Sequence, residues 1–169
     1  MLGRMGDPGG HSGASPRASG ILMTLTYLAG GAGVAIGFNT VSGDDPSLTA
    51  AVLLAVGLAG FLSFLRHSVF HRSDAVRMGW DFGGRNNFQI EVGIANLAFA
   101  LLAVLAVVLD WGLVAEASAF LVFGFYLGGA AIMLLTSPRD EESRPWAPLL
   151  AMTAFAAMLI VIGFMGMAA

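Results

Sequence analysis

Five long apolar runs dominate this sequence and restrict it to one class of fold. They cover residues 21–38, 48–65, 88–109, 113–135 and 146–167. A helix needs about 20 apolar residues to cross the hydrocarbon core of a bilayer. Only 11% of the residues are charged, whereas soluble domains carry roughly 25%. The sequence therefore predicts an all-α integral membrane protein, a bundle of five transmembrane helices.

The segments outside these runs predict two further features. Residues 1–20 are rich in Gly, Ser, Pro and Ala and show no periodicity, which is typical of a disordered tail. Residues 21–169 then form a single transmembrane helical domain. Residues 67–80 predict a short interfacial helix, with Val69, Phe70, Val76 and Trp80 turned toward the membrane.

Three local patterns predict where helices begin and how they pack. Asp45-Pro46 has the residue types of an N-cap and first helical position, so it predicts the start of the second helix. Asn86 followed by Gln89 resembles a capping box at the start of the third helix. Glycines four residues apart, at 33 and 37 and at 124 and 128, predict close helix–helix contacts.

The arginines predict the orientation in the membrane. All eight basic residues are arginines, and they lie in the N-terminal tail, in 66–87 and in 136–145. Cytoplasmic loops carry the excess of basic residues, so these three segments are expected in the cytoplasm and the C-terminus outside. The predicted location is the bacterial cytoplasmic (inner) membrane, spanned several times. Four of these arginines are expected at the membrane surface: Arg66, Arg72, Arg77 and Arg85.

The third helix carries the polar residues that enter the apolar part of the chain. Gln89 and Asn96 share a stripe of small residues, which predicts a seam between helices or the lining of a small polar cavity. Tyr126 is expected level with Asn96 on the fourth helix and within hydrogen-bonding reach. Glu91 lies nearly opposite Gln89, and either an interfacial structural role or a buried functional one is open to it. Glu116 is expected near the outer end of its helix.

His67, His71 and Asp74 are a weak candidate for a metal site. Their spacing of four and three residues places them on one face of a helix, as two imidazoles and a carboxylate could hold a divalent cation. No fourth ligand is near in sequence, and the surrounding arginines oppose a cation. The interfacial helix is the alternative interpretation, and no cofactor is expected.

The central segment resembles an uncharacterised family of small bacterial multi-helix integral membrane proteins. The pattern includes His67, Phe70 and Gly79-Trp80, followed by FQIEVGIANLAFALLAVLA with Glu91 and Ala95-Asn96-Leu97. The resemblance covers about residues 67–135. Ala100 stands where family members often have glycine, and residues 133–135 lack an expected histidine. The resemblance implies fold and location and carries no activity.

The function expected from the sequence is that of a small non-enzymatic membrane protein. It would associate with copies of itself or serve as an accessory subunit of a larger membrane complex, in contact with membrane lipids and not with nucleic acid. The alternative is a transporter or a lipid-, quinone- or small-molecule-binding protein with a polar pocket on the third helix. An intramembrane enzyme would need Glu91 as acid or base with no visible second catalytic group.

Overall fold

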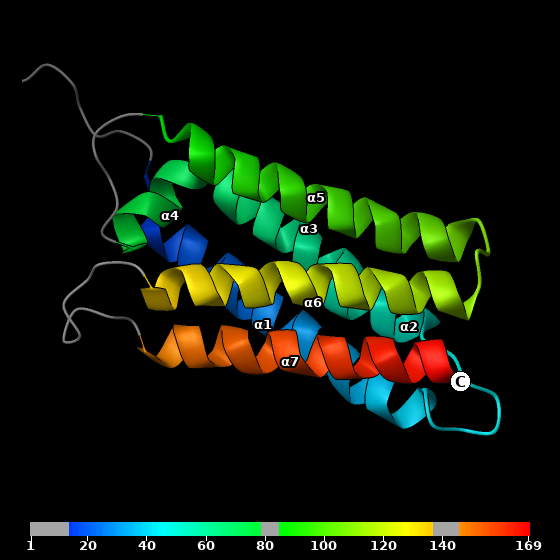
Figure 1. The fold of residues 1–169 in the computed structure, drawn as a ribbon. Helices are drawn as coiled ribbons and strands as arrows, with labels where there is room; N and C mark the ends of the chain where they lie inside the picture. Colours follow the sequence, from blue (N-terminus) through cyan, green and yellow to red (C-terminus); the bar gives the residue numbers. More distant parts are fainter. Residues whose placement is uncertain (1–13, 79–84, 137–145) are drawn as a thin grey trace, which may run out of the picture.

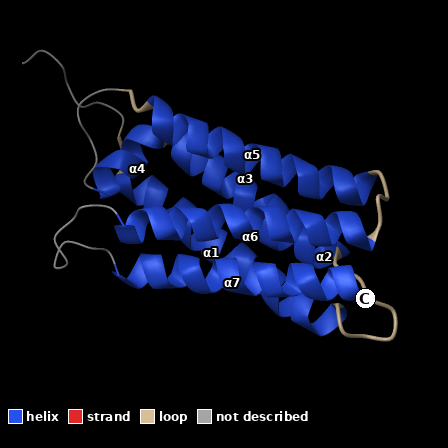
Figure 2. Ribbon diagram, in the orientation of Figure 1, coloured by secondary structure: helices blue, strands red, loops and turns tan. Residues whose placement is uncertain are grey.

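The computed structural model describes residues 14–78, 85–136 and 146–169, and these residues form helices with no strand among them (Figure 2). Five helices are long and apolar enough to cross a membrane. They span Pro16–Thr40, Thr49–Val69, Asn87–Val108, Leu113–Thr136 and Trp146–Ala168. They run alternately in opposite directions along one bundle (Figure 1). The predicted all-α fold with five long apolar helices is confirmed.

The first helix, α1 (Pro16–Thr40), begins five residues before the predicted start at residue 21. Ser15 caps it, since its Oγ accepts a hydrogen bond from the backbone N–H of Ala18 at 3.3 Å. Proline at the first helical position fits because its missing N–H would have no partner there. Residues 16–20 are therefore helical, and residues 1–13 lie outside the described part of the chain.

The second long helix is built from four consecutive pieces. These are α2 (Thr49–Val52), η1 (Leu53–Leu58), α3 (Ala59–Phe64) and η2 (Leu65–Val69), of which η1 and η2 are π-helical. A π-helical turn has its hydrogen bonds between residues five apart, and such turns are frequent at functional sites. The helix continues to Val69, four residues past the predicted end.

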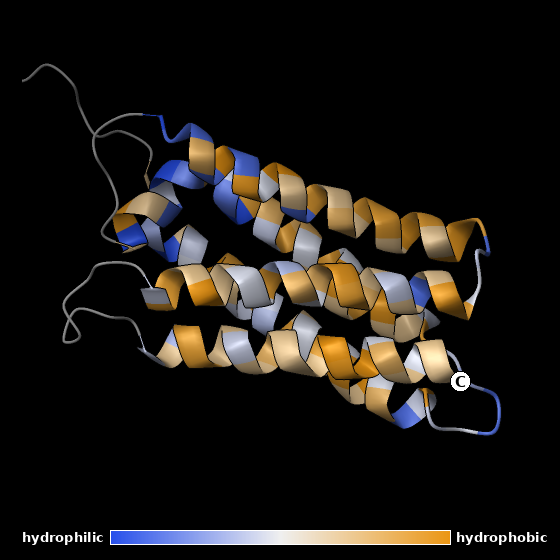
Figure 3. Ribbon diagram, in the orientation of Figure 1, coloured by the Kyte–Doolittle hydropathy of each residue, from blue (hydrophilic) through white to orange (hydrophobic). Residues whose placement is uncertain are grey.

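The short helix α4 (His71–Met78) follows a break at Phe70. It lies at the end of the bundle where α1 and α5 begin, here called the α4 end (Figure 1). Figure 3 shows that hydrophilic residues gather at this end, while the long helices are mostly apolar. The predicted interfacial helix was placed at 67–80; its first residues belong to η2, and residues 79–84, including Trp80, lie outside the described residues.

The last three long helices are α5 (Asn87–Val108), α6 (Leu113–Thr136) and α7 (Trp146–Ala168). Asn86 caps α5, because its Oδ1 accepts a hydrogen bond from the backbone N–H of Gln89 at 3.1 Å. A tight turn joins α5 to α6, with Asp110 at φ 51° and Gly112 at φ 83°. Glycine suits the second of these positions because it has no Cβ to clash in the left-handed region.

The predicted start of the second helix at Asp45-Pro46 is wrong. The helix begins at Thr49, and Leu48 at its N-cap provides no side-chain acceptor. Glu116 of α6 supplies the acceptors instead. Its Oε2 accepts from the Leu48 backbone N–H at 3.3 Å, and its Oε1 accepts from Thr49 Oγ1 at 2.7 Å. A buried carboxylate from a distant helix thus caps α2, at the end opposite α4.

Glycines set the closest approaches between the helices. A Cβ added at Gly33 of α1 would lie 2.5 Å from the backbone nitrogen of Ala55, and one at Gly60 would lie 2.9 Å from the Asn96 carbonyl oxygen. One at Gly124 would lie 3.2 Å from the Ala156 carbonyl oxygen, whereas Gly128 has open space around it. The predicted glycine contacts therefore form within this chain, although Gly128 does not take part in them.

Candidate functional site

Asp74 of α4 is the centre of a buried polar cluster at the α4 end. The residue is fully buried, and its two carboxylate oxygens receive bonds from two neutral side chains. Ser19 Oγ of α1 donates to Oδ1 at 2.6 Å, and Gln89 Nε2 of α5 donates to Oδ2 at 2.8 Å. The carboxylate therefore joins α4 to α5 and to α1, whose Ser19 is 55 residues away in the sequence.

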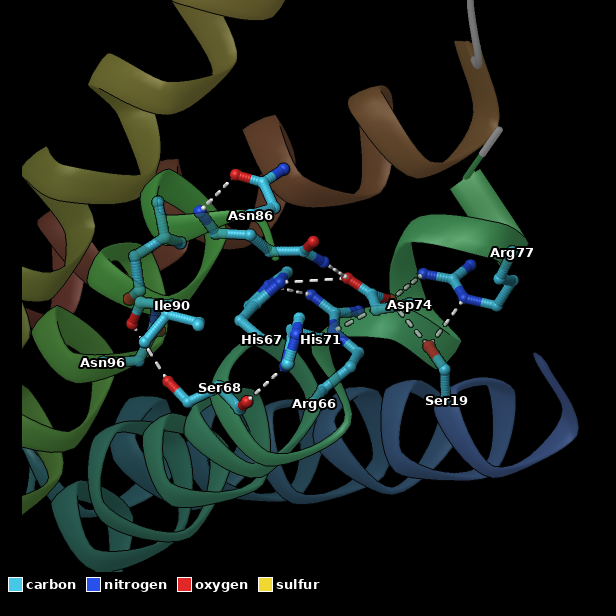
Figure 4. Close-up of polar contacts among 12 residues, drawn as sticks. Ser19, Arg66, His67, Ser68, His71, Asp74, Arg77, Asn86, Ile90 and Asn96 are labelled. Carbon is cyan, nitrogen blue, oxygen red and sulfur yellow. Dashed lines mark hydrogen bonds and ion pairs between the residues drawn. The ribbon is translucent and has the colours of Figure 1, made fainter. Parts of the chain in front are cut away.

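Three basic side chains surround the same carboxylate (Figure 4). Arg77 Nη2, one helical turn after Asp74, donates to Oδ1 at 2.9 Å. His67 Nδ1 lies 3.0 Å from Oδ2, and Arg66 Nε lies 3.8 Å from Oδ1. Together with the neutral partners these residues form the Asp74 cluster: Ser19, Arg66, His67, Asp74, Arg77 and Gln89.

A second set of bonds holds α4 against the first turns of α1. Arg77 Nε donates to Ser19 Oγ at 2.9 Å, so this hydroxyl accepts from Arg77 while it donates to Asp74. The backbone N–H of Ser15 donates to Ser73 Oγ at 2.9 Å. Because a buried polar group is costly unless it is hydrogen-bonded, these bonds fix α4 in one position on the bundle.

The charges around Asp74 outweigh the effect of its burial. Burial alone raises the pKa of a carboxyl group, because it disfavours the charged form. The contact with His67 and the positive charge of Arg66 act in the opposite direction. They hold the pKa of Asp74 well below its ordinary value. Asp74 is therefore a carboxylate that stays ionised, and it has no proton to donate at neutral pH.

The local course of the chain explains why Arg66 and His67 both enter the cluster. They are consecutive residues of η2, and the wider π-helical turn holds the two side chains beside Asp74 (Figure 4). Ser68, the next residue, donates from its Oγ to the Ile90 carbonyl at 3.0 Å. Gly93 of α5 lies directly against Ser68, where a side chain would collide with it. The absence of a Cβ at Gly93 thus brings η2 close enough to α5 to form the cluster.

The four residues predicted to form a polar group around the third helix do not form one site. Gln89 belongs to the Asp74 cluster. Asn96 is buried and donates to the Val92 carbonyl of its own helix at 2.7 Å, while its hydrogen bond with Tyr126 stays a prediction. Tyr126 also packs on Phe99, with 4.9 Å between ring centroids. Glu91 is exposed, and among the described residues it forms no ion pair.

The three weak metal candidates have different partners. His67 and Asp74 lie together, but His71 Nδ1 contacts the Ser68 carbonyl oxygen at 2.9 Å. Within residues 14–78, 85–136 and 146–169, no group of three His, Asp or Glu side chains is arranged to hold a metal ion. The four arginines predicted at the membrane surface also differ in their surroundings. Arg66 and Arg77 turn into the cluster, whereas Arg72 and Arg85 are exposed.

Ser19 is the member of the cluster that the sequence analysis missed, because residues 1–20 were assigned to a tail. The signal for it was present at Ser15-Pro16, where serine at the N-cap precedes proline at the first helical position. A helix that begins there places Ser19 one turn inside α1. The position of Asp74 at the centre of the cluster could not be predicted from a local sequence pattern, since its partners lie on four separate elements.

Comparisons with known proteins place the chain in a family but give it no activity. A family model described as a family of unknown function, DUF6790, matches residues 21–168. No curated protein and no solved structure matches the chain.

Proposed function

The chain belongs to the DUF6790 family, whose function is unknown, and we propose that it is a small non-enzymatic integral membrane protein. It acts as a subunit, either self-associating or accessory to a larger membrane complex. The observation that carries the proposal is the state of Asp74, which is the most deeply buried carboxylate among the described residues. Both of its oxygens are occupied by side chains of this chain.

A carboxylate in this condition is suited to holding helices together. A general acid or base must reach a proton of the substrate, and a metal ligand must offer a free oxygen. Asp74 accepts three hydrogen bonds, from Ser19, Arg77 and Gln89, and His67 Nδ1 lies 3.0 Å from its Oδ2, so little of the acceptor capacity of a carboxylate is left free. The cluster therefore supports a rigid structural end of the bundle, as a subunit would present to a partner.

The test of this function is purification of the tagged protein from native membranes in a mild detergent. Mass spectrometry of the sample, for proteins and small molecules alike, is the measurement. The expected result is a stoichiometric protein partner or a defined oligomer of the chain itself. A monomer without any protein partner would contradict the proposal. A control sample from membranes that contain the untagged chain identifies proteins that bind to the resin.

One observation favours the alternative of a small-molecule-binding protein. Gln89 Oε1 is buried and has no hydrogen-bond partner among the residues that the structure describes. A ligand with a hydrogen-bond donor would satisfy it, since an unpaired buried acceptor costs about 1–3 kcal/mol. A retained small molecule in the same sample, lost in a Gln89→Leu variant, would support this alternative over the first.

The orientation that we propose places the α4 end in the cytoplasm of a bacterial cell, with the inner membrane around the long helices. The support is the position of the described arginines, all of which lie at the α4 end. Arg17 is near the start of α1, Arg85 just precedes α5, and the other three lie in residues 66–77. The chain has no cysteine, so single cysteines report their location without interference. A membrane-impermeant maleimide should label Asp110→Cys and leave Arg85→Cys unlabelled in intact cells. The reverse pattern would contradict this orientation.

A further inference from the structure

The contact between Arg66 and His67 fixes the protonation state of the imidazole. Arg66 Nη2 lies 2.6 Å from His67 Nε2. A guanidinium group has only donors, so Nε2 must accept this hydrogen bond and carries no proton. The single proton of the neutral ring is then on Nδ1, the atom that lies 3.0 Å from Asp74 Oδ2. His67 is therefore a neutral group that accepts a hydrogen bond from Arg66 and lies beside the Asp74 carboxylate (Figure 4).

A second proton on His67 cannot be added without a change in this arrangement. It would bind Nε2, and two N–H groups would then face each other across the contact with Arg66. The charged groups that face His67 come from η2 itself and from α4: Arg66, Asp74 and Arg77. When His67 is neutral, the net charge of these groups together with His67 is +1, and when His67 is protonated it is +2.

The remaining neighbours do not absorb the additional charge. From α5 the cluster receives Gln89, which is neutral, and from α1 it receives the Ser19 hydroxyl. Tyr27 of α1 is the other titratable group near Arg66, and it is not a basic residue. α3 contains no titratable residue. The repulsion between Arg66 and a protonated His67 is therefore relieved only if one of them leaves its position.

We propose that His67 is a proton-binding site that controls the position of Arg66 and, with it, the attachment of α4 to the bundle. Binding of a proton at Nε2 breaks the Arg66–His67 hydrogen bond and displaces the guanidinium from the Asp74 cluster. Asp74 then loses one of its surrounding positive groups, and α4 separates from α1 and α5 more often. The ligand of the site is the proton itself, and the response is a local opening at the α4 end.

His71 provides a matched comparison within the same segment. Its Nδ1 contacts the Ser68 carbonyl oxygen, so this nitrogen donates in the neutral and in the protonated ring alike. Protonation of His71 therefore breaks no contact of this kind. A pH response that depends on His67 and not on His71 would be specific to the arrangement around Arg66.

The experiment measures hydrogen exchange of the α4 amides in the full chain, purified in detergent, between pH 7.5 and 5.5. When the opened state exposes His67 to water, that state binds a proton below a pH of about 6.5, which is the ordinary value for histidine. The opening constant, corrected for intrinsic exchange, should then rise about tenfold per pH unit below this value, because one proton is taken up on opening. His67→Gln should remove this slope and His71→Gln should retain it. Arg66→Gln should reduce it, since Nε2 is then free to accept a proton.

A second measurement needs no variant, so it decides the matter even if His67→Gln does not fold. Nitrogen-15 NMR of the ring should show His67 at pH 7.5 as the neutral form protonated on Nδ1. A ring protonated on Nε2, or on both nitrogens at this pH, would overturn the proposal. An opening constant independent of pH in the wild-type chain, or a slope that persists in His67→Gln, would overturn it equally.

Discussion

Asp74→Asn should lower the free energy of unfolding by about 3 kcal/mol, as expected when one partner of a buried ion pair is removed. The side chain keeps its shape, but the charge that Arg66 and Arg77 face is lost. The amide nitrogen of asparagine is also a donor, so it meets the donors of Ser19 or Gln89 at one of the two former oxygen positions. Reversible unfolding in detergent, followed by far-UV circular dichroism, measures the change.

Asp110→Asn is the matched control for this variant. Asp110 is exposed in the turn between α5 and α6, and its positive φ of 51° is one that asparagine adopts readily. The same substitution there should change stability by no more than about 0.5 kcal/mol. Equal effects at the two positions would mean that the Asp74 cluster does not stabilise the bundle.

The pH dependence of the wild-type chain should identify the same carboxylate. The folded-state pKa of Asp74 lies below its ordinary value. The stability that the ionised Asp74 carboxylate contributes is therefore fully present above a pH of about 3.9, the ordinary pKa of aspartate. This stability is lost as the pH falls from there toward the folded-state pKa. This part of the acid destabilisation should be missing in Asp74→Asn. Its persistence in the variant would assign the effect to other carboxylates.

Gly33→Ala should destabilise the bundle by about 1–3 kcal/mol, the usual cost of overpacking a well-packed core. The new methyl group would meet the backbone nitrogen of Ala55 at 2.5 Å and the Ala51 carbonyl oxygen at 2.8 Å. Backbone atoms cannot rotate away as the end of a side chain can, so α1 must separate from α2 and η1. Titration of the protein in a mild detergent with a denaturing detergent measures the decrease in the free energy of unfolding.

Gly31→Ala tests whether this loss arises from the contact or from the helix. Gly31 lies on the same helix, and an added Cβ there meets nothing within 4 Å. Alanine is the better helix former by about 0.5–1 kcal/mol, so Gly31→Ala should leave stability unchanged or raise it. A similar loss in both variants would contradict the close contact of α1 with η1.

The long helices could be predicted from the sequence because their signal is local. An apolar run of about 20 residues has one stable form in lipid, since a helix satisfies all its backbone hydrogen bonds within the segment. α5, α6 and α7 accordingly begin at or within one residue of the predicted positions, at Asn87, Leu113 and Trp146. The cap at Asn86 was predictable for the same reason, because donor and acceptor are three residues apart.

The candidate site could not be predicted in this way, because it depends on contacts between distant residues. The Ser19–Asp74 bond joins residues 55 positions apart, and no periodicity records such a pairing. Arg66 and His67 lie in the π-helical turn η2 and contact each other and Asp74, although Arg66 was predicted at the membrane surface. Gln89 was recognised as a polar residue on a helix seam, but its partner was not.

The cap that Glu116 places on α2 can form only after the first turn of α6 has been synthesised. Leu48 N–H and Glu116 Oε2 are 68 residues apart, so the ribosome finishes the second long helix well before it reaches the acceptor. Until α5 and the first turn of α6 have been made, the backbone donor at Leu48 must be satisfied by water or by a lipid headgroup. The start of the second long helix, at the end of the bundle opposite α4, therefore reaches its final hydrogen bonding only after α6 has been made.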